Sequence, residues 1–141
     1  MIRAFIVTLI LVLVIMLALD FAWLSLTAEA LYRPNMAGLM RVKPDLVPAA
    51  AFYLLYGINL TWLVLFPVLF GGRGRPSLID LSIKSALFGL AAYGTYDLTA
   101  LAVIRDWPLR LSLIDMAWGM VITLATALLT AGALKVLKLR L

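Results

Sequence analysis

Four long apolar stretches constrain this chain more than any other feature of its sequence. They cover approximately residues 4–31, 46–70, 78–104 and 112–137. A helix needs about 20 predominantly apolar residues to cross the hydrocarbon core of a bilayer, and each stretch is long enough to do so. The sequence therefore predicts an all-α membrane protein, with residues 1–141 forming a single domain of four transmembrane helices in an up-down bundle.

The composition favours a membrane protein over a soluble one. Of the 141 residues, 65% are hydrophobic and 13% are charged. A soluble domain of this length cannot bury so much apolar surface, and a soluble helical bundle needs more charge on its outer faces. The net charge of +5 could suggest nucleic acid. The basic residues lie at the ends of the apolar stretches, however, so membrane orientation explains them better, and we expect no nucleic-acid partner.

Two missing residue types narrow the possible chemistry. The sequence contains no Cys and no His, which excludes thiol nucleophiles, disulfides, imidazole catalysis and His-ligated metals. We expect no metal site, and nothing in the sequence indicates a particular cofactor. Proton chemistry would have to use Asp, Tyr, Lys or the single glutamate, Glu29. No catalytic motif is recognisable, so enzymatic activity is left open, with modification of membrane lipids as one possibility.

Polar and helix-breaking residues separate the four stretches. Residues 32–35 are predicted to end the first helix, and the following loop is expected to hold a short interfacial helix at about residues 36–42. A Gly- and Arg-rich turn at residues 71–76 separates the second and third helices, and residues 105–108 separate the third and fourth. The first stretch is too long for a signal peptide and is interrupted by polar residues, so we expect it to be retained.

The tetrapeptide Ser-Leu-Ile-Asp occurs twice, at Ser77–Asp80 and at Ser112–Asp115. A serine followed three residues later by an acidic residue is typical of a helix-capping box, which predicts helix starts at both places. Asp115 is therefore interpreted in two ways, as part of a cap or as a site residue. Asp80 and Lys84 are expected to form a surface pair one helical turn apart.

An even number of crossings places both termini on one side of the membrane. Seven basic residues fall on that side and five on the other, so the positive-inside rule favours cytoplasmic termini. The terminal side carries Arg3, Arg73, Arg75, Lys84, Lys135, Lys138 and Arg140, and the other side carries Arg33, Arg41, Lys43, Arg105 and Arg110.

Three aspartates within the apolar stretches need an explanation beyond a surface pair: Asp20, Asp97 and Asp115. A carboxylate near the bilayer centre costs about 2.5–3.5 kcal/mol on insertion scales, so such residues usually face the bundle interior and find a partner. Asp97 is the best candidate for acid–base chemistry. With the polar and aromatic residues of the same half of the membrane, these aspartates form the predicted ligand site, which consists of Asp20, Trp23, Tyr53, Tyr56, Asn59, Tyr93, Tyr96, Asp97, Thr99, Asp115 and Trp118.

Helical spacing adds two further patterns. The first and fourth helices both contain Asp-x-Ala-Trp, at residues 20–23 and 115–118, although a match of four residues can arise by chance. Trp23 and Trp118 could also belong to an interfacial aromatic belt, a role that Tyr32 and Trp107 fit better by position. The fourth helix carries a stripe of Ser, Gly and Thr residues that is more typical of helix packing than of chemistry.

The chain resembles a known family in the segments Leu19–Leu24, Phe52–Tyr56, Ala92–Thr99 and Trp107–Gly119. This is the bacterial membrane family called domain of unknown function twenty-one seventy-seven. The resemblance covers nearly the whole chain and implies a four-helix protein of the inner membrane with no established activity. Its members tend to lie near genes for fatty-acyl modification, which is a hint about lipids.

Three functions are compatible with these patterns. The first is a polar and aromatic pocket in the outer half of the membrane that binds a lipid or a small amphipathic molecule. The second is a proton-coupled small transporter, because intramembrane carboxylates are typical of proton relays. The third is a structural or assembly role, with another membrane protein or a second copy of the chain as partner.

Overall fold

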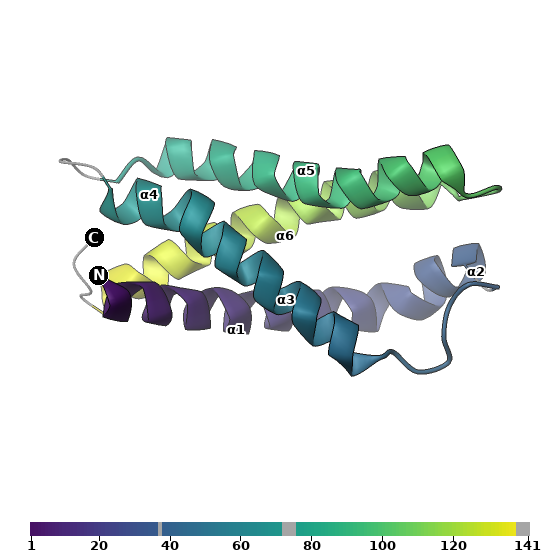
Figure 1. Ribbon diagram of the computed structural model, residues 1–141, viewed down its shortest axis with the longest axis horizontal. Coiled ribbons are helices and arrows are strands. Elements are labelled where there is room, and N and C mark those ends of the chain that lie inside the picture. Colours follow the sequence, from purple (N-terminus) through teal and green to yellow (C-terminus); the bar gives the residue numbers. More distant parts are fainter. Residues whose placement is uncertain (37, 72–75, 138–141) are drawn as a thin grey trace.

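The computed structural model describes residues 1–36, 38–71 and 76–137, which fold into long helices (Figure 1). Two of the four helical rods are continuous, and two contain a π-helical turn. The first rod consists of α1 (Ile2–Thr27), a π-helical turn (Ala28–Tyr32) and α2 (Arg33–Met36). The second consists of α3 (Leu46–Leu60), a π-helical turn (Thr61–Leu65) and α4 (Phe66–Phe70), and the third and fourth are α5 (Leu78–Val103) and α6 (Leu109–Val136).

All four rods are long and apolar enough to cross a membrane, which confirms the predicted fold class. Figure 1 shows that α1 begins and α6 ends at the same end of the bundle. We call this the terminal end, and we call the other end, which carries α2 and the α5–α6 turn, the loop end. The rod of α3 and α4 crosses the bundle obliquely.

The first rod extends further than predicted, because the helix does not stop at residues 32–35. The amide of Arg33 bonds to the carbonyl of Ala28, five residues back, so the hydrogen-bond register changes just before Pro34. A wide π turn accommodates a residue that cannot donate a hydrogen bond. The expected interfacial helix at residues 36–42 is wrong for the described part, since residues 38–43 form turns and bends; Ala37 lies outside the described residues.

The fourth helix also begins earlier than predicted, at Leu109, and Pro108 precedes it without a side-chain cap. The proposed capping box at Ser112–Asp115 is therefore wrong. Ser112 instead accepts a hydrogen bond from Trp107 at 2.9 Å. Asp115 lies six residues inside the helix, or about 9 Å along its axis at about 1.5 Å per residue, which is deeper than an interfacial cap.

The other predicted local features are present where the structure describes them. The Ser77 hydroxyl accepts the Asp80 amide at 3.1 Å and so caps α5, and Lys84 pairs with Asp80 at 2.9 Å. Of the predicted turn at 71–76, residues 72–75 lie outside the described part. The turn at 105–108 is confirmed, and Asp106 adopts a φ of 59° there, a conformation that Asp tolerates better than most residues.

α5 and α6 approach each other closely at two glycines. A Cβ atom added to Gly89 would lie 2.2 Å from the carbonyl oxygen of Gly119, and one added to Gly119 would lie 2.3 Å from the ring of Tyr93. No larger residue fits at either position without a shift of the backbone or of a buried ring. The small-residue stripe of α6 is therefore a packing surface for α5, as the sequence indicated.

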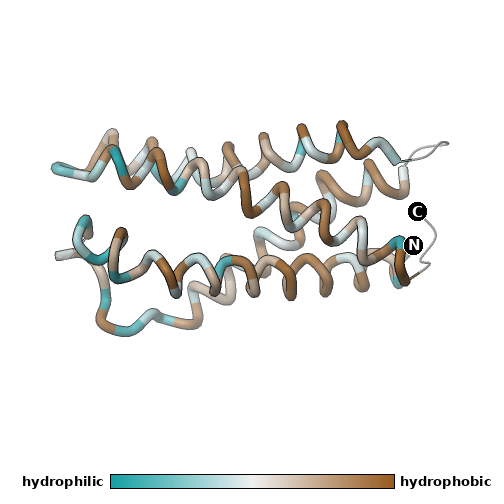
Figure 2. The backbone as a smooth tube through the Cα atoms, turned by 180° about the vertical axis from the view of Figure 1, so that it is seen from behind, coloured by the Kyte–Doolittle hydropathy of each residue, from teal (hydrophilic) through white to brown (hydrophobic). Residues whose placement is uncertain are grey.

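The outside of the bundle is apolar. Leu26, Phe21 and Ile79 are 79%, 76% and 75% exposed, although each is a large hydrophobic residue. In Figure 2, hydrophilic positions gather at the loops and helix ends, and hydrophobic positions fill most of the helix lengths between them. Such a surface is stable in hydrocarbon and unfavourable in water.

Candidate functional site

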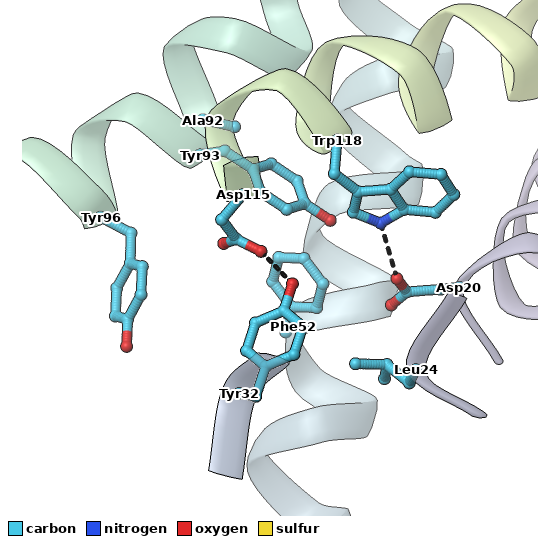
Figure 3. Close-up of a pocket in the computed structure, with 9 residues that line it drawn as sticks. All are labelled: Asp20, Leu24, Tyr32, Phe52, Ala92, Tyr93, Tyr96, Asp115 and Trp118. Atoms are coloured by element: carbon cyan, nitrogen blue, oxygen red, sulfur yellow. Dashed lines mark hydrogen bonds between the residues drawn. The ribbon is translucent and has the colours of Figure 1, made fainter. Parts of the chain in front are cut away.

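A pocket of about 250 Å³ lies among the helices, in the half of the bundle toward the loop end (Figure 3). Two carboxylates and several aromatic rings form its walls. They come from α1, the π turn after it, α3, α5 and α6. The lining residues are Asp20, Leu24, Tyr32, Phe52, Ala92, Tyr93, Tyr96, Asp115 and Trp118. We call this the first chamber.

Asp20 of α1 is 7% exposed and ties α1 to two other helices. Its carboxylate accepts a hydrogen bond from the Tyr53 hydroxyl of α3. It also accepts the indole N–H of Trp118 on α6 at 3.1 Å. Both carboxylate oxygens thus have a donor, which offsets part of the cost of placing the group inside the membrane.

Asp115 of α6 is held by a chain of two donors from the first rod. The Tyr32 hydroxyl donates to the Asp115 carboxylate. The same hydroxyl accepts the indole N–H of Trp23 at 3.0 Å. Tyr32 was predicted to be an interfacial belt residue, but the π turn that ends at Tyr32 carries it inward to the pocket.

The two Asp-x-Ala-Trp copies contact each other directly. The rings of Trp23 and Trp118 stack with centroids 4.3 Å apart and planes 8° from parallel. Each tryptophan is also linked by hydrogen bonds to the aspartate of the other copy. Trp118 donates directly to Asp20, whereas Trp23 donates to the Tyr32 hydroxyl, which in turn donates to Asp115. The repeat therefore marks one interface between α1 and α6.

Two tyrosines, Tyr56 and Tyr93, pack together at the wall of the first chamber. Tyr56 is buried, and its hydroxyl lies 2.6 Å from the Thr123 hydroxyl. Its ring meets that of Tyr93 edge to face at 6.3 Å, and Figure 3 shows Tyr93 between Asp115 and Trp118. Tyr56 therefore connects the wall residue Tyr93 to the buried Thr123 of α6.

Asp97 lines a second chamber of about 240 Å³ next to the first. The two chambers share Tyr32, Tyr96 and Asp115. Asp97 is 2% exposed, and its Oδ2 atom is buried without a hydrogen-bond partner among the described residues. The remaining lining residues are Met36, Met40, Trp107 and Leu111.

Two of the predicted site residues do not join the others. Asn59 donates to the carbonyl of Leu55 on its own helix at 2.8 Å and lines neither chamber. Thr99 is exposed, and its hydroxyl bonds back to the carbonyl of Thr95. The structure brings together the other nine, with Trp23, Tyr53 and Tyr56 supporting the walls and the remaining six lining them.

Comparison with known families gives one match. The profile described as "Predicted membrane protein (DUF2177)" covers residues 5–132. The chain belongs to this family. Every residue that lines the two chambers lies within the matched range. Neither the curated proteins nor the solved structures contain a match to the chain.

The charge distribution of this DUF2177 protein separates its intramembrane carboxylates from its basic groups. Within the described ranges, the ion pairs are Arg33–Glu29, Arg41–Asp45 and Lys84–Asp80, all at exposed positions. None involves a chamber carboxylate. The two chambers therefore present acidic oxygen atoms and aromatic rings, with no cationic side chain from the described residues bonded to them.

A third hollow, of about 750 Å³, lies at the terminal end of the DUF2177 bundle. Its lining is mainly aliphatic, with Lys135 as the charged member. It shares no residue with the two chambers. The predicted site chemistry is thus confined to the loop end.

Four wall residues of the first chamber were missed from the sequence: Leu24, Tyr32, Phe52 and Ala92. Leu24 and Ala92 are apolar residues in apolar helices, and nothing distinguishes them from lipid-facing neighbours. Phe52 could have been found, because it directly precedes Tyr53 and shares its aromatic run. Tyr32 could not, since its direction depends on the π turn.

Proposed function

We propose that this DUF2177 protein binds a lipid or a small amphipathic molecule in the two chambers, in the outer half of the bacterial inner membrane. The observation that carries the proposal is that the walls of the first chamber reach the outside of the bundle. Phe52 and Tyr96 line the chamber and are also 42% and 55% exposed. If this outside faces lipid, as we propose, a ligand dissolved in the bilayer would enter between the helices without crossing water.

The chamber chemistry suits such a ligand. Binding sites for small molecules are typically apolar and aromatic with a few well-placed polar groups, and range over about 300–1,000 Å³. Each chamber is slightly smaller than that range and has two carboxylates among aromatic walls. This volume fits a polar head group and the first carbons of a chain. The rest of the chain would lie along the exposed apolar surface.

Blocking the first chamber tests this proposal. Ala92 lines the chamber, whereas its neighbour Ala91 on α5 is exposed on the outside. Ala92→Phe places a ring in the chamber, and Ala91→Phe places the same ring toward lipid, so the two variants form a matched pair. Mass spectrometry of the molecules that copurify with the full chain should show a bound species for wild type and Ala91→Phe, and its loss for Ala92→Phe.

Folding must be checked separately, because Ala92 also packs against the core. Circular dichroism melting identifies a variant that fails to fold, and Leu24→Trp then blocks the same chamber from α1. An identical set of copurifying molecules in folded wild-type and blocked proteins would contradict the proposal.

Proton-coupled transport is a second candidate, favoured by one observation. The hydroxyls of Thr61, Thr126 and Thr130 are buried without hydrogen-bond partners among the described residues. These threonines lie further toward the terminal end than Tyr56 and Tyr93. Proton relays in membranes are built mainly from Asp, Glu and His side chains, so water would have to join these hydroxyls to the chamber carboxylates. Thr126→Val should then abolish a pH-driven flux in proteoliposomes while the bound species is retained, and an unchanged flux would contradict transport through these hydroxyls.

A further inference from the structure

We propose that the polar end of the ligand is an ammonium group, held in the second chamber between Asp97 and Asp115. This inference rests on the proposed function and deepens it by naming the chemical class of the head group. It starts from Asp97, the acidic group in the chambers whose bonding the protein leaves incomplete.

Asp97 needs a donor that the described residues do not supply. Its side chain is 2% exposed and its Oδ2 atom has no partner, while Asp20 in the first chamber has a donor on each oxygen. A buried carboxylate without a partner is costly, and the cost is relieved by a proton, by water or by a cation. The Asp97 side chain lines the second chamber, so a donor in that chamber would lie next to its carboxyl group.

A second carboxylate faces the same chamber. Asp115 receives one donor, the Tyr32 hydroxyl, and lines the second chamber with Asp97. Two ionised carboxylates in one small space repel each other, and a proton or a cation between them removes that repulsion. A cation with several N–H donors satisfies both groups at once.

The aromatic walls favour an organic cation. Tyr96 and Trp107 meet edge to face with centroids 5.8 Å apart, and both line the chamber. The Trp107 ring is fixed by its hydrogen bond to Ser112. Aromatic faces attract ammonium groups, whereas Ca²⁺ and Mg²⁺ prefer about six or more oxygen ligands. Two carboxylates, three aromatic rings and methionine side chains are a poor match for a hard metal ion.

The charge expected of the ligand head group follows from the basic residues of the chain. No Lys or Arg of the described residues bonds to Asp97 or Asp115. A phosphate or carboxylate head group would meet two negative charges without compensation, which selects against anionic ligands. An amine has the opposite sign and the required donors.

The test compares three amphiphiles of equal chain length: octylammonium, octanol and octanoate. Their binding to the full chain is measured by equilibrium dialysis in dodecyl maltoside micelles, which contain no amine, with protein-free micelles as the blank. Octylammonium should bind at least about tenfold more tightly than octanol, the ratio expected when a charge-assisted hydrogen bond is added. Octanoate should bind most weakly.

Variants assign this preference to the second chamber. Asp97→Asn should remove the preference for octylammonium and leave octanol binding intact, while Asp80→Asn, on the same helix and 44% exposed, should change neither. If Asp97→Asn fails to fold, Trp107→Leu tests the same chamber from its aromatic wall and should reduce the preference several-fold.

The outcomes distinguish the two proposals. Equal binding of octylammonium and octanol would overturn the ammonium inference and keep the amphiphile pocket. Binding of none of the three would overturn both. If both Asp97→Asn and Trp107→Leu keep the preference for octylammonium over octanol, the ammonium group does not bind in the second chamber. Methylammonium distinguishes two sources of the ammonium group. Binding as tight as that of octylammonium would support the ammonium site with a free amine as its ligand, whereas weaker binding would point to an amine-bearing lipid.

Discussion

Trp118 on α6 donates its indole N–H to Asp20 on α1 at 3.1 Å, across 98 positions of the sequence. The same ring stacks on Trp23, so one side chain joins the two copies of the Asp-x-Ala-Trp motif. In hydrocarbon, apolar burial gives little drive for helix association, and hydrogen bonds and close packing become the main specific forces. This interface therefore fixes both the position of α1 against α6 and the shape of the chamber.

Removal of the indole donor should destabilise the bundle. Trp118→Phe keeps a ring for the stack but leaves one oxygen of Asp20 without its donor, and an unsatisfied buried group costs about 1–3 kcal/mol. We expect that loss in the free energy of unfolding, measured by denaturant titration in mixed micelles. Trp62→Phe is the control, because Trp62 is 61% exposed on the lipid side. Equal effects of the two substitutions would contradict the role of the hydrogen bond.

Asp20 and Tyr53 should be energetically coupled. Tyr53→Phe removes the hydroxyl that donates to Asp20, and Asp20→Asn removes the charge of the acceptor. Residues that share a hydrogen bond show interaction energies of about 0.5–3 kcal/mol in double-mutant cycles. The cycle, measured as free energies of unfolding, should give a value within that range. Strictly additive effects would show that the two groups act independently.

The glycines between α5 and α6 should tolerate no methyl group. A Cβ at Gly89 would lie 2.2 Å from a backbone oxygen, whereas one at Gly132 on α6 meets nothing within 4 Å. Gly89→Ala should therefore lower the midpoint of thermal unfolding. Gly132→Ala should leave it unchanged or raise it slightly, since Ala is favoured over Gly in a helix by about 1 kcal/mol. A Gly89→Ala protein as stable as wild type would contradict the close approach.

Membrane orientation can be read from single cysteines, because the natural chain has none. Asp106 lies in the α5–α6 turn at the loop end, and Ser77 lies before α5 at the terminal end. If the termini are cytoplasmic, a membrane-impermeant maleimide added to intact cells should label Asp106→Cys and not Ser77→Cys. The reverse labelling pattern would place the chambers in the inner half of the membrane.

The helices and the inward position of the acidic groups could be predicted because both follow from burial costs. A carboxylate such as Asp97 is expensive in hydrocarbon wherever it occurs, so its inward direction needs no knowledge of the partners. The pairing of Asp20 with Trp118 depends on how α1 meets α6, which no local pattern specifies. The π turn before Arg33 escaped prediction for a related reason, since Pro34 in sequence indicates a helix end.

Asp115 shows how a small boundary error changes an interpretation. A start at Ser112 makes it a cap, whereas the observed start at Leu109 places it one turn deeper, where Tyr32 reaches it. Asn59 and Thr99 show the opposite error. Both lie in the predicted helices, but their side chains bond to their own helices and neither residue lines a chamber.

An experimental density map of the full chain, determined in lipid with octylammonium present, would test the two chambers most directly. We expect density for the amphiphile in the chambers, with its nitrogen between the carboxylates of Asp97 and Asp115 and its chain passing Phe52 toward the bilayer. A map in which both chambers are collapsed or filled by protein side chains, or in which Asp20 and Asp97 point toward acyl chains, would contradict an intramembrane binding site.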